Sequence, residues 1–359
     1  MLRGPVCILL CLVSSFCAIA QPLAAYVDIQ NQVMVWDKGM IRKIDYLPPV
    51  LMKVGRSAIP YLDNSRAFKI YYGGGTKEIN IGFTNAFFVS DNLVAYLNAK
   101  ALNVFDRGTA KRLTNICDEY YLADSVLLYL DGQRREYRVY YEGQTYQIEG
   151  FIPDSTLPSI KVSDNIVAFD NFAGLFRIFY HGAVIPQEDY PVSSFDAGRN
   201  TVAYVDANRQ FKIFHNGQNF VVEDYPPQSY TVGDNLVAYV SSDGYFKIFY
   251  QDSIRNLGFF QPIYQVGDNV VGYRDPSGYF KAFYKGDITD LENYYPDNYV
   301  IQYNSIAYIN KAGTLRMFTE GEAYDVTNAT LSNWEMHYDV LKYQIGQNIF
   351  RVFYKGRDY

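Results

Sequence analysis

Residues 232–239 have the sequence VGDNLVAY, and copies of this stretch recur along the chain. Near copies lie at 89–96, 162–169 and 266–273, and weaker ones at 54–61 and 197–204. The aromatic residue that ends each copy, here called the reference aromatic, falls at Tyr26, Tyr61, Tyr96, Tyr129, Phe169, Tyr204, Tyr239, Tyr273, Tyr308 and Tyr343. Successive positions are 33–35 residues apart except for one interval of 40, which contains an insertion at 152–158. The chain therefore consists of about ten repeats of ~35 residues.

A second apolar block follows each reference aromatic, as in Phe246-Lys247-Ile248-Phe249. Turn-forming residues such as Ser242-Asp243-Gly244 separate the two blocks, which is typical of a β-hairpin. A glycine and a weaker strand come next, and proline closes several repeats, as in Asp224-Tyr225-Pro226. The cleanest copy predicts four strands, at 228–233, 236–241, 245–250 and 253–259.

The middle two strands of each repeat are apolar on both faces, so both faces must be covered. Neighbouring blades of a propeller supply such cover. In this general pattern the chain resembles β-propeller repeat proteins of the WD40-like kind over nearly all of residues 22–359, although the WD dipeptide is absent. The resemblance implies an all-β propeller of four-stranded antiparallel blades, forming one domain over residues 21–359.

The repeat pattern predicts the blades but allows more than one way for them to form a ring. Ten hairpins indicate ten blades, with two five-bladed rings or an open array as alternatives. The first copy lacks a leading strand, and the last ends at Tyr359, just after its third strand. Closure is expected to pair these two ends.

The first twenty residues are expected to be a signal peptide. Arg3 precedes an apolar run, Val6–Phe16, and Ala18-Ile19-Ala20 fits signal-peptidase cleavage after Ala20. The run is too short to span a membrane, and Phe16 disfavours lipidation of Cys17. Only Cys117 remains after cleavage, so the product has no internal disulfide, which favours a bacterial exported protein. It is expected in the periplasm, on the outer-membrane surface or outside the cell.

The composition of the chain limits the classes of partner and of functional site that it can have. The net charge of −6 argues against nucleic acid, and no later segment is apolar enough to be transmembrane. No catalytic motif, metal-ligand spacing or cofactor signature is present, so no catalytic residue, metal or cofactor is predicted. The Asp-Asn turns lack the ligand spacing of a calcium loop. His181 and His215 are expected at the surface, and with His337 they are too scattered for a metal site.

The most specific pattern is a cation at one position of the third strand, replaced only by Met34 and Asn103. Its members are Lys69, Arg138, Arg177, Lys212, Lys247, Lys281, Arg316 and Arg351. The expected partners are the turn aspartates Asp91, Asp124, Asp164, Asp234 and Asp268, although Arg56 and Arg199 occupy that position in two copies. The simpler interpretation is a repeated structural ion pair; the alternative is a cationic ring that binds an acidic ligand or glycan.

The abundant aromatic residues, 35 Tyr and 24 Phe, are mostly expected in the core. Those outside the repeat pattern are better candidates for stacking on sugars: Tyr120, Tyr121, Tyr294, Tyr295 and Trp334.

The sequence favours an exported, non-enzymatic binding or scaffolding module that presents one ring face to a protein or glycan. The alternatives are a carbohydrate-active hydrolase or lyase with acidic residues at the central channel, and a structural component of a cell-envelope assembly.

Overall fold

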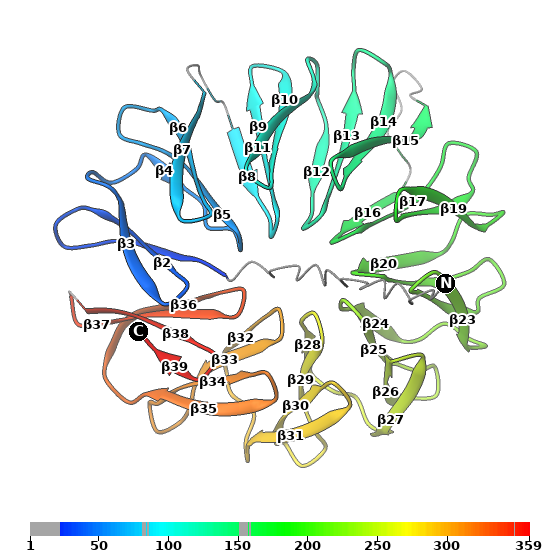
Figure 1. Cartoon of the computed structure of the whole chain (residues 1–359). Helices are drawn as coiled ribbons and strands as arrows, with labels where there is room; N and C mark the ends of the chain where they lie inside the picture. The colour runs from blue at the N-terminus through cyan, green and yellow to red at the C-terminus, as the bar shows by residue number, and fades with distance from the viewer. Residues whose placement is uncertain (1–21, 81–83, 85, 151–156, 158, 348) are drawn as a thin grey trace, which may run out of the picture.

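The repeats form ten antiparallel β-sheets arranged as the blades of one ring (Figure 1). The computed structural model describes residues 22–80, 84, 86–150, 157, 159–347 and 349–359. Nine blades have four strands and the first has three, with strands in chain order from the centre to the rim. The all-β propeller with about ten repeats is therefore confirmed, and the two-ring and open-array alternatives are wrong. The predicted signal peptide, 1–20, and the insertion at 152–158, apart from Leu157, lie outside the described residues.

Each strand position recurs from blade to blade. The first strands, nearest the centre, are β4 (Leu51–Met52), β8 (Ala86–Val89), β12 (Tyr120–Leu122), β16 (Ser159–Ser163), β20 (Ser194–Gly198), β24 (Ser229–Val232), β28 (Tyr264–Val266), β32 (Tyr299–Gln302) and β36 (Leu331–His337). The second strands are β1 (Ala24–Val27), β5 (Ala58–Leu62), β9 (Leu93–Asn98), β13 (Val126–Asp131), β17 (Ile166–Asp170), β21 (Thr201–Val205), β25 (Leu236–Val240), β29 (Val270–Arg274), β33 (Ser305–Ile309) and β37 (Val340–Ile345).

The outer half of each blade is equally regular. The third strands are β2 (Val33–Asp37), β6 (Phe68–Tyr72), β10 (Ala101–Asp106), β14 (Glu136–Tyr141), β18 (Phe176–Tyr180), β22 (Phe211–His215), β26 (Tyr245–Tyr250), β30 (Phe280–Tyr284), β34 (Leu315–Thr319) and β38 (Ile349–Tyr354). The fourth strands are β3 (Met40–Asp45), β7 (Gly75–Asn80), β11 (Thr109–Thr114), β15 (Gln144–Gly150), β19 (Ala183–Glu188), β23 (Gln218–Glu223), β27 (Ser253–Phe259), β31 (Asp287–Glu292), β35 (Glu322–Thr327) and β39 (Arg357–Asp358).

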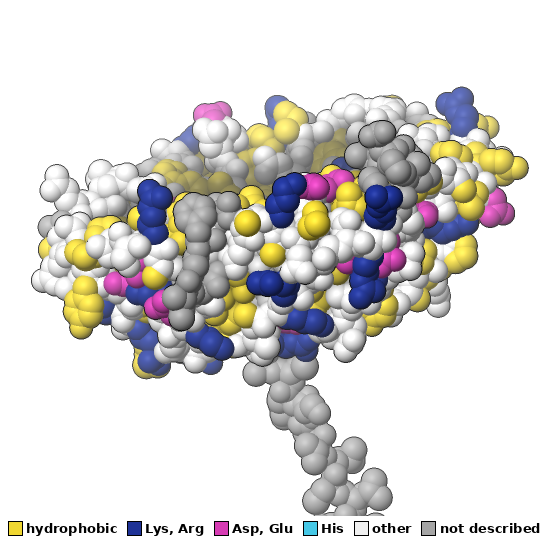
Figure 2. Space-filling model, turned by 90° about the horizontal axis from the view of Figure 1, so that it is seen from above, with side chains coloured by type: hydrophobic (Ala, Val, Ile, Leu, Met, Phe, Trp, Pro, Cys, Tyr) yellow, Lys and Arg dark blue, Asp and Glu magenta, His cyan; other side chains and the backbone are white. Residues whose placement is uncertain are grey.

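The core lies between blades, as the two-faced apolar strands predict. Every residue of β25 is buried, and its Leu236 and Ala238 pack with Val271 and Phe283 of the next blade. Because each blade covers its neighbours in this way, no blade has a complete core of its own. Viewed edge-on, the ring is a disc whose rim carries basic, acidic and apolar side chains interspersed (Figure 2).

The meander gives the disc two different faces. Turns between first and second strands and between third and fourth strands lie on one side, here called the turn face. Turns between second and third strands, and the connections from one blade to the next, lie on the other side, here called the connection face. The antiparallel order in every blade therefore brings all nine first-to-second turns together at the centre of the turn face.

Ring closure differs from the expectation. The last repeat does have a fourth strand, β39, so its predicted end after three strands is wrong. Among the described residues, no ladder joins the first blade to the last. Side chains close this seam instead: Trp36 packs against Tyr354 and Tyr359, Tyr26 stacks on Phe350 with ring centroids 4.5 Å apart, and Lys342 Nζ donates to Ala25 O.

We expect Tyr26→Ala to lower the free energy of unfolding by about 2 kcal/mol, since it removes a stacked aromatic pair and buried area at the seam. Urea unfolding followed by circular dichroism measures this. Tyr46→Ala, which truncates a largely exposed ring, should change stability by less than about 0.5 kcal/mol. Equal losses in the two variants would show that the seam contact contributes nothing specific.

Candidate functional site

Neighbouring blades are joined at the centre of the turn face by backbone hydrogen bonds. The bonds run from the turn of one blade to the turn of the next: Ser57 N to Asp91 O, Asn92 N to Asp124 O, Ser125 N to Asp164 O, Asp234 N to Asp268 O, and Asp268 N to Tyr303 O. Asparagine side chains add further links, such as Asn165 Nδ2 to Asn200 Oδ1 at 2.7 Å. This close approach brings the side chains of equivalent turn residues together.

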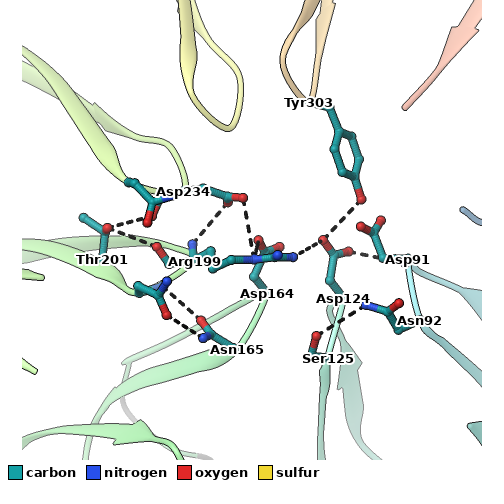
Figure 3. A network of polar contacts seen from close by, with 12 residues as sticks. Asp91, Asn92, Asp124, Ser125, Asp164, Asn165, Arg199, Thr201, Asp234 and Tyr303 are labelled. Carbon is teal, nitrogen blue, oxygen red and sulfur yellow. Dashed lines mark hydrogen bonds and ion pairs between the residues drawn. The ribbon is translucent and has the colours of Figure 1, made fainter. Parts of the chain in front are cut away.

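The residues five positions before each reference aromatic are here called the turn ring, and Figure 3 shows the part of it around Arg199. Its described members are Arg56, Asp91, Asp124, Asp164, Arg199, Asp234, Asp268, Tyr303 and Tyr338. Five carboxyl groups thus lie with two guanidinium groups and two phenols in one small region. The turn aspartates were singled out from the sequence, but only as partners for the third-strand cations.

Arg199 is the centre of this cluster. Its guanidinium group lies 2.9 Å from the Asp164 carboxylate, 3.6 Å from Asp124 and 3.7 Å from Asp234. The three carboxyl groups come from three different blades, β12–β15, β16–β19 and β24–β27. One arginine side chain therefore links four blades, including its own.

The opposite side of the turn ring has a second, weaker cation pair. Arg56 lies 3.6 Å from Asp91, whose side chain is almost completely buried. Arg56 also lies over the Tyr303 ring, and the Tyr303 hydroxyl donates to Asp124 Oδ2 at 3.4 Å across the ring. Among the described residues, Asp91 Oδ1 has no hydrogen-bond partner.

Burial and crowding change the acidity of these groups. Burial raises the pKa of Asp124 and of Asp234 to about 10, with neighbouring carboxylates adding to the effect. Burial likewise raises the pKa of Asp91 and of Asp268 to about 7. Burial also opposes ionisation of Asp164, but hydrogen bonds from Asp124 and Asp234 and the charge of Arg199 outweigh it and lower its pKa. At neutral pH, Asp164 is therefore ionised and its two neighbours hold protons.

The raised pKa values predict that the folded protein is most stable at mildly acidic pH. The folded state binds more protons than the unfolded chain between about pH 4, where free aspartate titrates, and the folded pKa values of about 7 and 10. Stability must therefore fall as pH rises through this window. Below about pH 4 stability also falls, because Asp63 has a lowered pKa of about 2 in its ion pair with Lys69. We expect a higher Tm at pH 5 than at pH 8 by calorimetry; the reverse order would contradict the proton sharing.

A cavity of about 500 Å³ adjoins the turn ring. Its walls include Asp124, Asp164, Asp234 and Asp268 together with the backbone of the glycines Gly198, Gly233 and Gly267. Within the described residues, no group of carboxylate, histidine or cysteine side chains has the arrangement of a metal site. The Asp164 carboxylate hydrogen-bonds with the carboxyl groups of Asp124 and Asp234, so the arrangement can hold and share protons and stabilise the closed centre of the ring.

The eight third-strand cations lie elsewhere. Their cross-strand partners are the reference aromatics, as in Tyr204 opposite Lys212 and Tyr239 opposite Lys247. Four of them bind a carboxylate at the end of the preceding blade: Lys69 to Asp45, Lys212 to Glu188, Lys247 to Glu223 and Arg316 to Glu292. The hydroxyls of Tyr61, Tyr204, Tyr239 and Tyr308 donate to the same four carboxylates.

The other four cations have more local partners. These are Glu136 for Arg138, the carbonyl oxygens of Phe176 and Glu188 for Arg177, Asp275 and Asp290 for Lys281, and Asp358 for Arg351. The prediction that the turn aspartates are their partners is therefore wrong, because each cation lies opposite a reference aromatic near the connection-face end of its blade, whereas the turn ring lies on the turn face. None of the eight is among the described residues that line the central cavity. Ligand binding by these cations stays a prediction.

We expect Lys212→Met to lower the free energy of unfolding by about 1–3 kcal/mol, since Glu188 and Asp206, each 2.8 Å from its ammonium group, lose their partner in a largely buried site. The matched control is Lys161→Met, which removes an exposed pair 3.7 Å long with Asp196 and should cost less than about 0.5 kcal/mol. Urea unfolding measures the stability of both variants. A loss of similar size in the two would contradict the role of Lys212 in joining neighbouring blades.

The remaining sequence candidates have varied positions. His181 is exposed as expected, but His215 is buried, where its Nδ1 contacts Thr201 and burial lowers its pKa, so its surface assignment is wrong. Cys117 is a buried free thiol.

The aromatic stacking candidates fall into two surface hollows: Tyr120 and Tyr121 line one, and Tyr294, Tyr295 and Trp334 line another. The sequence of a single repeat did not predict these groupings, because residues of adjacent blades form each hollow.

Sequence comparison decides the family. The model of a 10-bladed beta propeller domain matches residues 17–359. The chain belongs to this family. No curated protein matches the sequence of this ten-bladed propeller. No helix in the described part of the chain is long and apolar enough to cross a membrane.

Solved structures similar to this ten-bladed propeller share little sequence with it. The computationally designed Ika8 protein is 16% identical, with a TM-score of 0.35, over 77% of this chain and 97% of its own. Kluyveromyces lactis Hsv2p is 9% identical, with a TM-score of 0.30, over 66% and 94%. The CRINKLY WD40 ectodomain of the Arabidopsis thaliana receptor kinase ACR4 is also 9% identical, with a TM-score of 0.30, over 66% and 93%.

Proposed function

We propose that the chain is an exported, non-enzymatic binding propeller that presents its connection face to a protein or glycan. The observation that carries this proposal is a set of bulky aromatic side chains left exposed at, or just after, the ends of the fourth strands of four blades. The set comprises Tyr46, Tyr190, Tyr225 and Phe259, each exposed by 68–71%. Tyr46, Tyr190 and Tyr225 follow β3, β19 and β23, and Phe259 is the last residue of β27. Fourth strands end at the connection face, so all four residues lie there.

Exposed tyrosines suit a binding surface for a physical reason. A tyrosine ring supplies a large contact area with few rotatable bonds, and its hydroxyl both donates and accepts hydrogen bonds. The core does not use these rings, whereas the reference aromatics Phe169, Tyr204 and Tyr239 of three of the same repeats are buried. Retaining large apolar groups in water at repeated positions is more typical of a binding surface than of a structural need.

The test compares a face variant with a rim variant. The face variant is Tyr46→Ser/Tyr190→Ser/Tyr225→Ser, and the control is Ile254→Ser/Ile288→Ser on the exposed outer strands β27 and β31. Both proteins and the native chain are applied to a glycan array and used to capture labelled proteins from the native organism. We expect partners that the native chain and the rim variant hold equally, and that the face variant loses. Equal capture by all three proteins overturns the proposal.

One observation favours the alternative, a carbohydrate-active enzyme: acidic residues from several blades do meet at the centre of the ring. An ionised Asp164 beside protonated Asp124 resembles an acid and base pair. However, glycosidase carboxyls stand about 5–10 Å apart to flank the scissile bond, whereas these two are in direct hydrogen-bond contact. Release of reducing sugar from polysaccharides by the native chain, and its loss in Asp164→Asn, would support the alternative.

A further inference from the structure

The connection face has a hollow of about 510 Å³ beside the innermost part of the ring. Three elements form it: the connection that carries Tyr294 and Tyr295, the turn between β33 and β34 that carries Lys311, and β36, which carries Trp334. The volume is within the range of small-molecule sites. The hollow thus places three aromatic residues from two separate parts of the sequence around one space.

Two of the aromatic rings are held in place before any ligand arrives. The Tyr294 hydroxyl accepts a hydrogen bond from Lys311 N at 2.7 Å, and Lys311 Nζ lies 4.1 Å from the centre of the Tyr294 ring. The hydroxyls of Tyr295 and Tyr299 are 2.6 Å apart, and the Tyr295 ring packs edge-on against Phe280. A ligand that contacts these rings therefore loses little affinity to side-chain ordering.

The third ring is anchored by packing. Trp334 is half-buried and contacts the apolar cluster between the last two blades, which includes Met317 and Leu341. One part of the indole is therefore fixed in the protein while another part lines the hollow. An indole offers the largest π-face of any side chain, suited to the C–H face of a pyranose ring.

The polar groups of the hollow define the ligand further. Asn298 and Asn310 supply amides, and the Asn310 Oδ1 atom holds the turn by accepting from Ala312 N and Thr314 N. The amide N–H groups of Asn310 thus remain as donors for a ligand hydroxyl. Asp297 and Lys311 have opposite charges, so the hollow has no net charge. A cationic ligand is disfavoured, because the Lys311 ammonium group already lies over the Tyr294 ring.

We propose that this hollow binds a neutral pyranose unit of a glycan, with Trp334 stacking on the sugar ring and the Asn310 and Asn298 amides bonding its hydroxyls. The inference rests on the proposed binding function and assigns its ligand class and its position on the connection face. Aromatic area alone would suit any apolar ligand; the combination of fixed rings, amides and zero net charge selects a polyhydroxylated neutral ring.

The chain contains only two tryptophans, and Trp36 is completely buried at the seam, which provides a direct readout. Neutral oligosaccharides that bind the native chain on a glycan array are titrated while tryptophan emission is recorded. We expect a saturable change in emission for the native chain and for the control Ile288→Ala, and none for Trp334→Phe. By calorimetry, Trp334→Ala should weaken binding by about tenfold or more, and so should Asn310→Ala.

Several results overturn the inference. Binding of a neutral oligosaccharide with unchanged emission and unchanged affinity in Trp334→Ala would place the sugar elsewhere. Binding only of charged glycans, or of peptides, at this hollow would contradict the ligand class. If no oligosaccharide binds while the face variant still loses a captured protein, the sugar site fails and the proposed function stands. A loss of Tm in Trp334→Ala is separated from a loss of binding by calorimetry on the folded Trp334→Phe protein, which keeps an aromatic ring at this position.

Discussion

Gly198→Ala should destabilise the propeller by about 3 kcal/mol or more, because its new methyl group would make the shortest contact of any glycine in the described part of the chain. A Cβ atom at Gly198 would lie 1.8 Å from the carbonyl oxygen of Gly233 in the next blade. The obstacle is backbone, so no change of rotamer relieves it, and the two blades would have to separate. Their separation would also weaken the contacts of Arg199, the adjacent residue, with Asp164 and Asp234.

The same close approach recurs around the ring. A Cβ at Gly233 would lie 2.4 Å from Gly267 O, and one at Gly267 would lie 2.3 Å from Tyr303 O. Thermal and urea unfolding of Gly198→Ala are compared with those of Gly75→Ala, a strand position with ordinary backbone angles and nothing within 4 Å of the new methyl. Gly75→Ala should leave stability unchanged or slightly raised. A small loss at Gly198, comparable with that at Gly75, would show that the blades tolerate wider spacing.

The repeat length and the position of the reference aromatics were enough to predict the blades. The four strands of the cleanest copy agree with β24–β27 to within about two residues at each end. The partners of the cations could not be predicted in the same way. Lys212 and Glu188 belong to adjacent blades, and a repeat alone does not say which strand ends meet across a blade interface.

The pairing of arginines with aspartates in the turn ring could have been predicted from the sequence. Arg56 and Arg199 looked like exceptions to an aspartate pattern, because each was judged against its own repeat. A closed ring places equivalent positions side by side, so an arginine at an aspartate position lies next to the aspartates of its neighbours. The two exceptions are therefore the counter-ions of the ring, and the signal for them was present in the sequence.

Arg199→Met should lower the free energy of unfolding by about 3–5 kcal/mol at pH 8, because it leaves Asp164 ionised and buried without its cation. Methionine keeps much of the side-chain volume, so the loss reports on charge rather than on a cavity. Asp164 has a lowered pKa partly because of Arg199; without the arginine its pKa must rise. At pH 5 Asp164 can then take up a proton, and we expect the loss to become smaller.

The double variant Arg199→Met/Asp164→Asn separates charge from packing. Removing the carboxylate together with its cation should restore part of the stability at pH 8, giving a coupling energy of about 1–3 kcal/mol in a double-mutant cycle. The cycle is repeated at pH 5, where the coupling should shrink, since protonation of Asp164 already removes its charge. Additive losses at both pH values would mean that Arg199 stabilises the ring through packing alone. A coupling that grows with pH identifies it as the electrostatic link between the four blades that it contacts.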